Sequence, residues 1–70
     1  MVKIKQFLLN GEIYYTKQNI NLLDLLTYFK YNNLFLVLEY NKAISDKTNW
    51  KNIFIKDQDQ IELVTIVGGG

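Results

Sequence analysis

The last three residues of the chain, Gly68, Gly69 and Gly70, together with the carboxylate that follows them, are the groups whose chemistry the sequence points to first. Glycine buries no side chain and loses more backbone freedom on ordering than any other residue, so packing does not explain three in a row. A segment without Cβ atoms can thread a narrow channel and leaves its terminal acyl carbon open to a bulky nucleophile. We therefore interpret residues 68–70 as a flexible tail, and any function it has must come from what the glycines lack or from the carboxylate that follows Gly70.

A carboxylate becomes an acyl donor only when one of its oxygens is converted into a leaving group, and the chain offers little for that step. It contains no Cys and no His, which excludes thiolate nucleophiles, imidazole bases, disulfides and the usual zinc sites. The acidic residues Asp57, Asp59 and Glu62 lack the spacing and the central glycine of a calcium loop, so we expect a solvated turn there. We predict no catalytic residue, no bound metal and no bound cofactor.

The three glycines also fit two other kinds of segment in principle. A disordered, inert terminus is the ordinary state of a chain end. A phosphate-binding loop is excluded, because no helix follows the glycines to present its N-terminus.

Length and composition indicate one domain with a real core. The chain has 70 residues, 49% of them hydrophobic, and its longest apolar run is far shorter than the roughly 20 residues of a membrane span. Eight lysines and seven acids give a net charge of +1 with no arginine, which disfavours nucleic acid as a partner. The first residues alternate and enter a turn rather than form a targeting segment. We expect the cytoplasm, or the plastid stroma if the chain is plastid-encoded, and no membrane partner.

Turn and periodicity signals predict the elements that hold this tail. Asn10-Gly11 is typical of a two-residue hairpin turn, here between strands at about residues 2–9 and 12–16. Asn21 can cap a short helix and Asp24 suits its positive end. The helix is indicated by apolar residues at i, i+3, i+4 and i+7, namely Leu22, Leu25, Leu26 and Phe29. A helix this short must pack on a sheet.

The second half of the chain predicts further strands. An apolar segment at residues 34–39 precedes a turn at Asn41-Lys42, and a polar crossover follows that we expect to be irregular and pinned by Trp50. Short strands are predicted at residues 53–55 and from residue 61 onward. The resulting order, ββαβββ or ββαββ, favours an α+β domain of the β-grasp type over residues 1–67, with a mixed four- to five-stranded sheet and one main helix across it. The rival is an OB-like barrel.

Strand alternation also predicts which side chains lie beneath the helix and which lie on the other face. Those expected beneath it are Phe7, Leu9, Leu36, Leu38, Ile61 and Leu63. The opposite face would then carry Val37, Glu39, Val64 and Ile66, which we predict to be a docking surface for partners. Tyr14 and Tyr15 fall on opposite faces, so one is expected in the core and one on the surface.

Taken together, these residues resemble the ThiS family of sulfur carrier proteins of thiamine biosynthesis, which are ubiquitin-like β-grasp domains. The resemblance covers nearly the whole chain. Asn10-Gly11 matches the family's first hairpin turn, and Asn41 followed by Trp50 matches its Asn…Trp spacing. The helix start at residues 21–26 and the ending Val64-Thr65-Ile66-Val67-Gly68-Gly69-Gly70 match as well.

The departures from the family pattern fall in turns and in the crossover. Asp57-Gln58-Asp59 stands where the family usually has Asp-Gly-Asp, Asn41-Lys42 where it has Asn-Gly, and Asp46-Lys47 where it has Pro-Arg. Residues 1–4 extend beyond the usual start, out of phase with Phe7 and Leu9, which predicts a bulge or a frayed end.

The resemblance implies a protein cosubstrate rather than an enzyme. An E1-like adenylyltransferase of the ThiF type would use ATP and Mg²⁺ to adenylate the carboxylate of Gly70. Sulfur supplied through a cysteine desulfurase would convert it into a thiocarboxylate, which donates sulfur to a thiazole synthase of the ThiG type. Gly68 and Gly69 would thread the partner's active site.

Other functions stay open at this point. The same fold and tail chemistry would serve a molybdopterin synthase small subunit or another ubiquitin-like sulfur carrier, such as one for tRNA thiolation. A different class of function is a β-grasp interaction domain with an inert tail.

Overall fold

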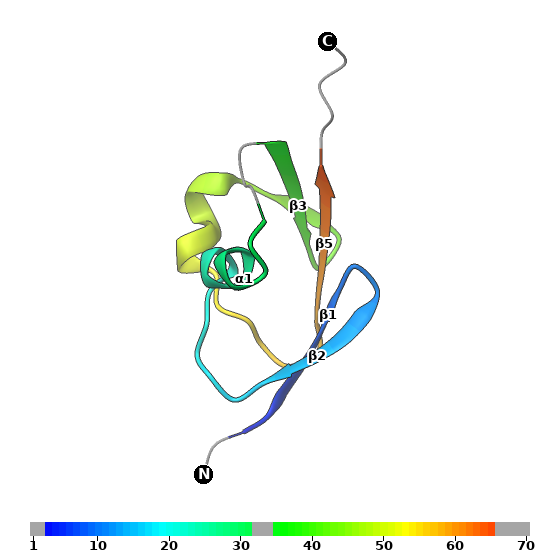
Figure 1. Cartoon of the computed structure of the whole chain (residues 1–70), viewed down its shortest axis with the longest axis vertical. Coiled ribbons are helices and arrows are strands. Elements are labelled where there is room, and N and C mark those ends of the chain that lie inside the picture. The colour runs from blue at the N-terminus through cyan, green and yellow to red at the C-terminus, as the bar shows by residue number, and fades with distance from the viewer. Residues whose placement is uncertain (1–2, 32–34, 66–70) are drawn as a thin grey trace.

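The computed structural model describes residues 3–31 and 35–65 of the chain. The strands and the main helix run in the order ββαβββ, one of the two predicted orders, but the fourth strand lies at residues 43–45 and not at the predicted 53–55 (Figure 1). The elements are β1 (Lys5–Leu9), β2 (Glu12–Thr16), α1 (Leu22–Tyr28), β3 (Leu36–Tyr40), β4 (Ala43–Ser45), the 3₁₀ helix η2 (Lys47–Asn52) and β5 (Asp59–Thr65).

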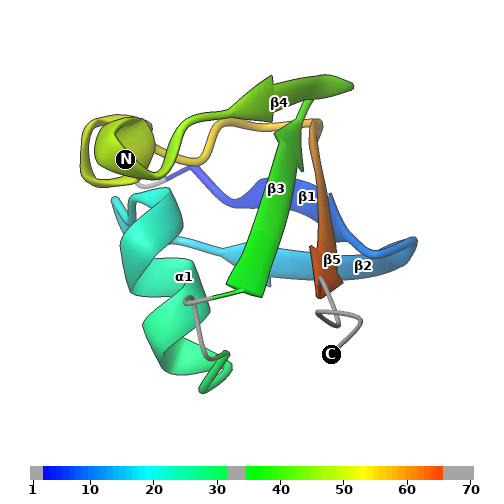
Figure 2. The same cartoon turned by 90° about the horizontal axis from the view of Figure 1, so that it is seen from above.

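The strands form one mixed sheet of order β2-β1-β5-β3-β4. β1 and β5 pair in parallel, and the other neighbours are antiparallel. α1 and η2 lie on the same side of this sheet, as the view from above shows (Figure 2). The expected α+β class, with a mixed sheet and one main helix across it, is therefore confirmed.

Two tight turns of the same backbone conformation connect the hairpins. Asn10 and Gly11 have φ of 51° and 82°, and Asn41 and Lys42 have φ of 52° and 70°. Positive φ at both central positions matches the right-handed twist of the flanking strands. Both turns were predicted, but the second one leads into β4 at residues 43–45, a strand that the sequence analysis did not identify.

The prediction of a strand at residues 53–55 is wrong. Phe54 makes only a single bridge, with Asn21. The backbone of this segment bonds to the start of the helix instead, because the Leu22 N–H donates to the Ile53 carbonyl at 2.9 Å and the Ile55 N–H donates to the Ile20 carbonyl at 2.9 Å. Ile55 is buried in the core and Ile53 packs against it from a loop, whereas Phe54 is 40% exposed. A short apolar run does not distinguish such a loop from a strand.

The crossover after β4 is regular rather than irregular. It forms η2, whose first turn is capped by the Asp46 carboxylate accepting from the Thr48 N–H at 3.3 Å. Trp50 lies in η2 and is only 2% exposed, and its Nε1–H donates to the Ser45 carbonyl at 3.1 Å. The prediction that Trp50 anchors this crossover is confirmed.

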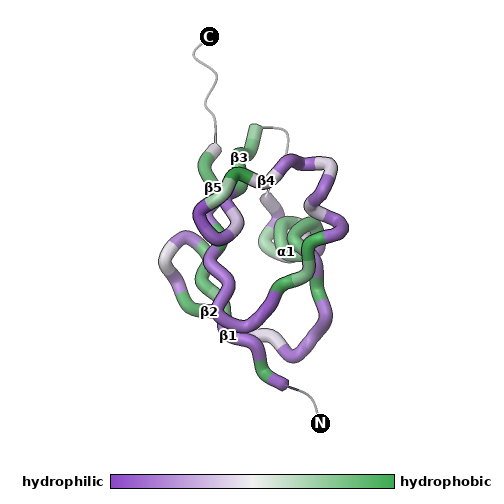
Figure 3. The backbone as a smooth tube through the Cα atoms, turned by 180° about the vertical axis from the view of Figure 1, so that it is seen from behind, coloured by the Kyte–Doolittle hydropathy of each residue, from purple (hydrophilic) through white to green (hydrophobic). Residues whose placement is uncertain are grey.

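The core lies between the sheet and the two helices. Figure 3 shows hydrophobic residues along β3, β5 and α1 and hydrophilic residues along most connections. The buried hydrophobic residues are Phe7, Leu9, Leu22, Leu25, Leu26, Leu36, Leu38, Trp50, Ile55 and Ile61. Leu63 is only partly buried against them.

α1 begins with the predicted cap. The Asn21 side chain accepts from the Asp24 N–H at 2.7 Å, and the Asp24 carboxylate accepts from the Asn21 N–H at 3.1 Å. A reciprocal cap of this kind contributes about 1 kcal/mol to a helix that is too short to form alone.

Two sequence predictions concern the first hairpin, namely the placement of Tyr14 and Tyr15 and the start of the first strand. Tyr14 packs edge-on against Phe29, with ring centroids 5.1 Å apart, whereas Tyr15 is exposed. Ile4 is also exposed, and β1 begins at Lys5 instead of at residue 2, which agrees with a frayed start. Met1 and Val2 lie outside the described residues.

Candidate functional site

The candidate reactive group sits beyond the last described residue of the central strand. β5 lies between β1 and β3 and ends at Thr65. Gly68, Gly69 and Gly70 lie outside the described residues, and so does Ile66. Their predicted roles as tether, modified residue and docking residue stay predictions. The structure describes the scaffold that carries them.

The start of β5 is fixed by a buried carboxylate. Asp59 is 5% exposed, and it accepts from the Tyr40 hydroxyl at 2.6 Å, the Lys56 N–H at 2.7 Å and the Asn41 Nδ2–H at 3.1 Å. The solvated turn expected at this residue is therefore wrong, because β5 begins at Asp59 and its register with Phe7 turns the side chain inward. Three donors satisfy the carboxylate, as a buried charge requires.

The other two acids of this segment have different environments. Asp57 stays on the surface and accepts from the Gln6 N–H at 2.7 Å. Glu62 is exposed on the far side of the sheet. Within residues 3–31 and 35–65 no three acidic, His or Cys side chains are close enough together to hold a metal ion.

Tyr40 is the one group whose titration this network shifts strongly. Its burial, and then the hydrogen bond it donates to Asp59, raise the pKa of Tyr40 to about 12. The phenol therefore stays protonated and remains a donor at neutral pH. This ties the end of β3 to the start of β5.

The two hairpin turns hold β5 from opposite sides through their asparagines. On the β1 side, the Asn10 N–H donates to the Ile61 carbonyl at 2.9 Å, and Asn10 Oδ1 accepts from the Leu63 N–H at 2.7 Å. On the β3 side, the Asn41 N–H donates to the Gln60 carbonyl at 2.7 Å, and Asn41 Oδ1 accepts from the Gln60 N–H at 2.8 Å. The strand leading to the tail is thus clamped by two side chains that sequence analysis identified only as turn residues.

The sheet face away from α1 carries the predicted docking residues that are described. Val37 lies opposite Val64, and Glu39 lies opposite Glu62. Val64 is 54% exposed, whereas Val37 and Glu39 are half-buried. Ile44 of β4, opposite Glu39, is 75% exposed and was missed, because β4 itself was not predicted. We call Val37, Glu39, Ile44, Glu62 and Val64 the outer face.

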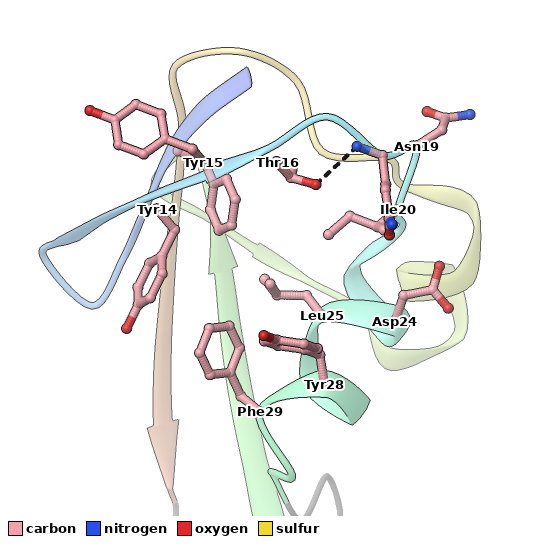
Figure 4. A pocket seen from close by; sticks show the side chains of 11 residues that line it. Tyr14, Tyr15, Thr16, Asn19, Ile20, Asp24, Leu25, Tyr28 and Phe29 are labelled. Atoms are coloured by element: carbon pink, nitrogen blue, oxygen red, sulfur yellow. Dashed lines mark hydrogen bonds between the residues drawn. The ribbon is translucent and has the colours of Figure 1, made fainter. Parts of the chain in front are cut away.

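A pocket of about 670 Å³ lies on the other side of the sheet, between β2, the loop after it and α1 (Figure 4). Its walls are mainly aromatic and aliphatic, with Tyr14, Tyr28 and Phe29 among them. The Asp24 carboxylate at its edge is already bonded to the Asn21 backbone, and the Thr16 hydroxyl accepts from the Gln18 N–H at 3.1 Å. The lining also includes Thr16, Gln18 and Asn19, so the pocket offers a mixed polar and apolar surface with a single carboxylate and no acid and base pair.

Taken together, a five-stranded mixed sheet with a parallel central pair, a helix across one face and a last strand leading into a glycine tail defines a ubiquitin-like β-grasp protein. The model of the ThiS family matches residues 7–70, and the chain belongs to that family. Its members are small sulfur carrier proteins rather than catalysts, and they act with partner enzymes.

Individual proteins are similar to this chain over most of its length. The ycf40 protein of Trieres chinensis is 58% identical over 66 residues, covering 94% of this chain and 90% of that protein. The ycf40 protein of Porphyra purpurea is 34% identical over 62 residues, covering 89% and 87%. The sulfur carrier protein ThiS of Bacillus subtilis (strain 168) is 35% identical over 63 residues, covering 89% and 96%.

A solved structure supports the fold. The crystal structure of the thiamine biosynthesis protein ThiS from Geobacter metallireducens superposes with a TM-score of 0.79 at 22% identity, covering 93% of this chain and 99% of that one. Among the described residues, no helix has the length and hydrophobicity needed to cross a membrane.

Proposed function

We propose that this protein carries sulfur for the synthesis of the thiazole ring of thiamine, with the Gly70 carboxylate as the group that is modified. The observation that carries the proposal is the family match, which runs through Gly70 at the end of the tail. The names of two similar proteins, a sulfur carrier of Bacillus subtilis and a thiamine biosynthesis protein of Geobacter metallireducens, support the pathway.

The chemistry requires three partners. An E1-like adenylyltransferase of the ThiF type, using ATP and Mg²⁺, joins a carboxylate oxygen of Gly70 to the α-phosphate of ATP and releases pyrophosphate. A persulfide sulfur that originates from a cysteine desulfurase attacks the acyl carbon and displaces AMP, which gives an acyl disulfide. A second thiol then attacks the donor cysteine's sulfur, so that a disulfide forms and the thiocarboxylate leaves with the electron pair of the broken sulfur–sulfur bond. A thiazole synthase of the ThiG type then takes that sulfur. Gly68 and Gly69 carry the carboxylate into each active site, because residues without Cβ fit a narrow channel.

The chain itself contributes positioning. β5 is held between β1 and β3 and is clamped by Asn10 and Asn41, so the described strand that precedes the tail in sequence has a fixed place in the domain. A partner that binds the domain therefore meets the end of β5 at a defined position. This supports a cosubstrate role, in which reactivity resides in the partner and geometry in the carrier.

Docking is proposed on the outer face, together with Ile66. Val64 and Ile44 expose large apolar side chains there, and exposed apolar area beside a reactive terminus is typical of an interaction surface. Glu39 and Glu62 lie directly opposite each other in the sheet. Like charges in this position repel, and a cationic side chain of a partner would relieve that repulsion.

The experiment that tests the proposal is intact-protein mass spectrometry after incubation with a ThiF-type enzyme, ATP, Mg²⁺ and a persulfide source. Replacing one oxygen by sulfur adds about 16 Da, and we expect this gain for the full chain. The control is a variant without Gly69 and Gly70, which should gain nothing. A full chain that stays unchanged with an enzyme proven active on another carrier would overturn the proposal.

The pathway and the compartment are tested in cells. A strain that lacks the chain should regain growth when thiazole is supplied, whereas loss of molybdoenzyme activity or of tRNA thiolation would indicate the alternative carriers. An inert interaction domain would tolerate deletion of Gly69 and Gly70. Of the two expected compartments we propose the plastid stroma, since three similar proteins bear the name ycf40, and proteins of that name are plastid-encoded. Fractionation of organelles checks this.

A further inference from the structure

β5 extends beyond the end of β1, the strand that pairs with it on one side. β1 pairs with β5 from Phe7 opposite Asp59 to Leu9 opposite Ile61, and there it ends. β3 pairs with β5 as far as Leu36 opposite Thr65. Figure 1 shows the end of β5 rising past the β1–β2 turn with only β3 beside it. The last residues of β5 therefore have a neighbouring strand on one side and an open place on the other.

The hydrogen bonds show which backbone groups face the open place. The Asn41 N–H donates to the Gln60 carbonyl, so Gln60 turns its backbone groups toward β3. The Asn10 N–H donates to the Ile61 carbonyl, so Ile61 turns its groups toward β1. Because this direction alternates along a strand, Leu63 and Thr65 also face the β1 side.

Asn10 covers the first of these groups and leaves the next ones open. Its side chain takes the place of a strand residue and accepts from the Leu63 N–H at 2.7 Å. β1 supplies no residue beyond Leu9, so the register gives the Leu63 carbonyl and the Thr65 N–H no partner on this side within the described part of the chain. An unpaired N–H and C=O row is a template for pairing with another strand.

Nothing in the side chains of this edge discourages pairing. Leu63, Val64 and Thr65 are uncharged, although natural edges are commonly blunted by lysine, proline or a bulge. The open edge also leads directly into the tail. A molecule that binds the tail therefore brings its own backbone close to this edge of β5.

We propose that the edge formed by Leu63 and Thr65 pairs with an extended segment of the activating enzyme, which occupies the place that β1 leaves open. This rests on the proposed function, because it takes the ThiF-type enzyme as the partner. The enzyme would hold the backbone immediately before the tail by main-chain hydrogen bonds. Recognition at this point then depends on the backbone of residues 63–65 and little on their side chains.

Removal of one backbone donor tests the proposal. Thr65→Pro deletes the N–H that faces the open place and is compatible with an edge position, since that N–H is not part of the ladder with β3. Thr65→Ala is the matched control, because it removes the side chain and keeps the N–H. We expect the rate of the mass gain to fall about tenfold for Thr65→Pro and to stay within about twofold for Thr65→Ala. Thermal unfolding at the wild-type temperature shows that both variants are folded.

Amide hydrogen exchange measures the pairing in the unaltered chain. The Thr65 N–H should exchange freely in the isolated protein and slow down when the ThiF-type enzyme is added in excess. The Val64 N–H, which belongs to the ladder with Val37, should be protected in both samples. This internal control separates local pairing from a general change in stability.

The outcomes are distinct. Equal rates for Thr65→Pro and wild type, or a Thr65 N–H that exchanges equally with and without bound enzyme, would overturn the paired edge while leaving sulfur transfer intact. A wild-type chain that gains no mass overturns the proposed function, and exchange at Thr65 still decides whether the edge pairs in the bound complex. Protection that rises with the concentration of the isolated chain would show pairing with a second copy, contrary to the proposal.

Discussion

The turn at Asn10-Gly11 and the turn at Asn41-Lys42 have the same conformation, and each sends an asparagine to β5. They differ in the hydrogen bonds that the asparagine side chain makes. Asn10 makes its side-chain bond to the Leu63 N–H alone, near the open end of the strand. Asn41 bonds both the Gln60 N–H and the buried Asp59 carboxylate. The turn at Asn10-Gly11 lies where the pairing of β1 with β5 ends, whereas the turn at Asn41-Lys42 fixes the start of β5.

This difference shows how one residue type serves two structural needs. Asparagine tolerates the left-handed conformation that both turns require, and its amide supplies an acceptor and two donors. Near the tail only the acceptor has a described bond, which leaves the following backbone groups of β5 available. At the other end of β5 both functions are used, and the strand is fixed where it begins.

The largest expected effect separates the two asparagines. Asn41→Gly keeps positive φ accessible but removes two hydrogen bonds, one of which is donated to a buried carboxylate, so the free energy of unfolding should fall by about 2 kcal/mol. Asn10→Gly removes one hydrogen bond and should cost about 1 kcal/mol. Urea unfolding of the two variants measures the difference. Equal losses would mean that the bond to Asp59 contributes nothing.

A smaller effect concerns the second residue of each turn. Lys42 has φ of 70°, and this chain places lysine where the family usually has glycine. Lys42→Gly should stabilise the protein by about 1 kcal/mol, because glycine adopts positive φ without a Cβ penalty. Gly11→Lys is the reverse change. A Cβ at Gly11 would meet no atom within 4 Å, so its cost should be conformational only and of similar size.

The double variant Gly11→Lys with Lys42→Gly sharpens this comparison. If the two turns are equivalent in conformation, the two effects should cancel within about 0.5 kcal/mol in thermal or urea unfolding, since the sites share no direct partner. A large residual would contradict the equivalence.

The smallest effect is confined to alkaline pH and to the Asn41 side of the molecule. Tyr40 has an ordinary pKa of about 10 when unfolded and about 12 when folded. Since the folded value is raised, its contribution to stability is complete below about pH 10 and is lost as the pH rises toward about 12. The phenol is partly in contact with solvent, so the loss should be modest.

Unfolding measurements at about pH 9 and about pH 11 test this for the wild type and for Tyr40→Phe. The wild type should lose more stability over this interval than the variant, which has no phenol to ionise at this position. Parallel pH profiles would contradict the assignment to Tyr40.

Much of this architecture could be predicted from the sequence because its signals are local. Asn10-Gly11 specifies its turn, and the reciprocal cap of Asn21 and Asp24 was foreseeable from their spacing. The alternation along β5 placed Val64 on the face away from α1. The role of Gly70, which lies outside the described residues, stays a prediction that rests on the family resemblance.

The missed features depend on contacts between distant segments. Asp59 reads as part of a polar turn, and only its register with Phe7 makes it a buried anchor. Phe54 and its neighbours read as a strand, but their backbone partners lie just before α1 and at its first residue. The open edge of β5 depends on where β1 stops relative to it, which no pattern within either segment contains.

The central position of β5 has a consequence for how the protein is made. β5 is the last of the described strands to leave the ribosome, yet it lies between β1, the first, and β3. A nascent chain that stops before residue 59 has no strand to join its first hairpin to the second, so the sheet cannot close during synthesis of the earlier segments. Such long-range pairing is intrinsically slow and leaves strand edges uncovered meanwhile. Folding of this domain is therefore expected to follow translation of β5, so a folded copy already has in place the strand that precedes the proposed site of modification.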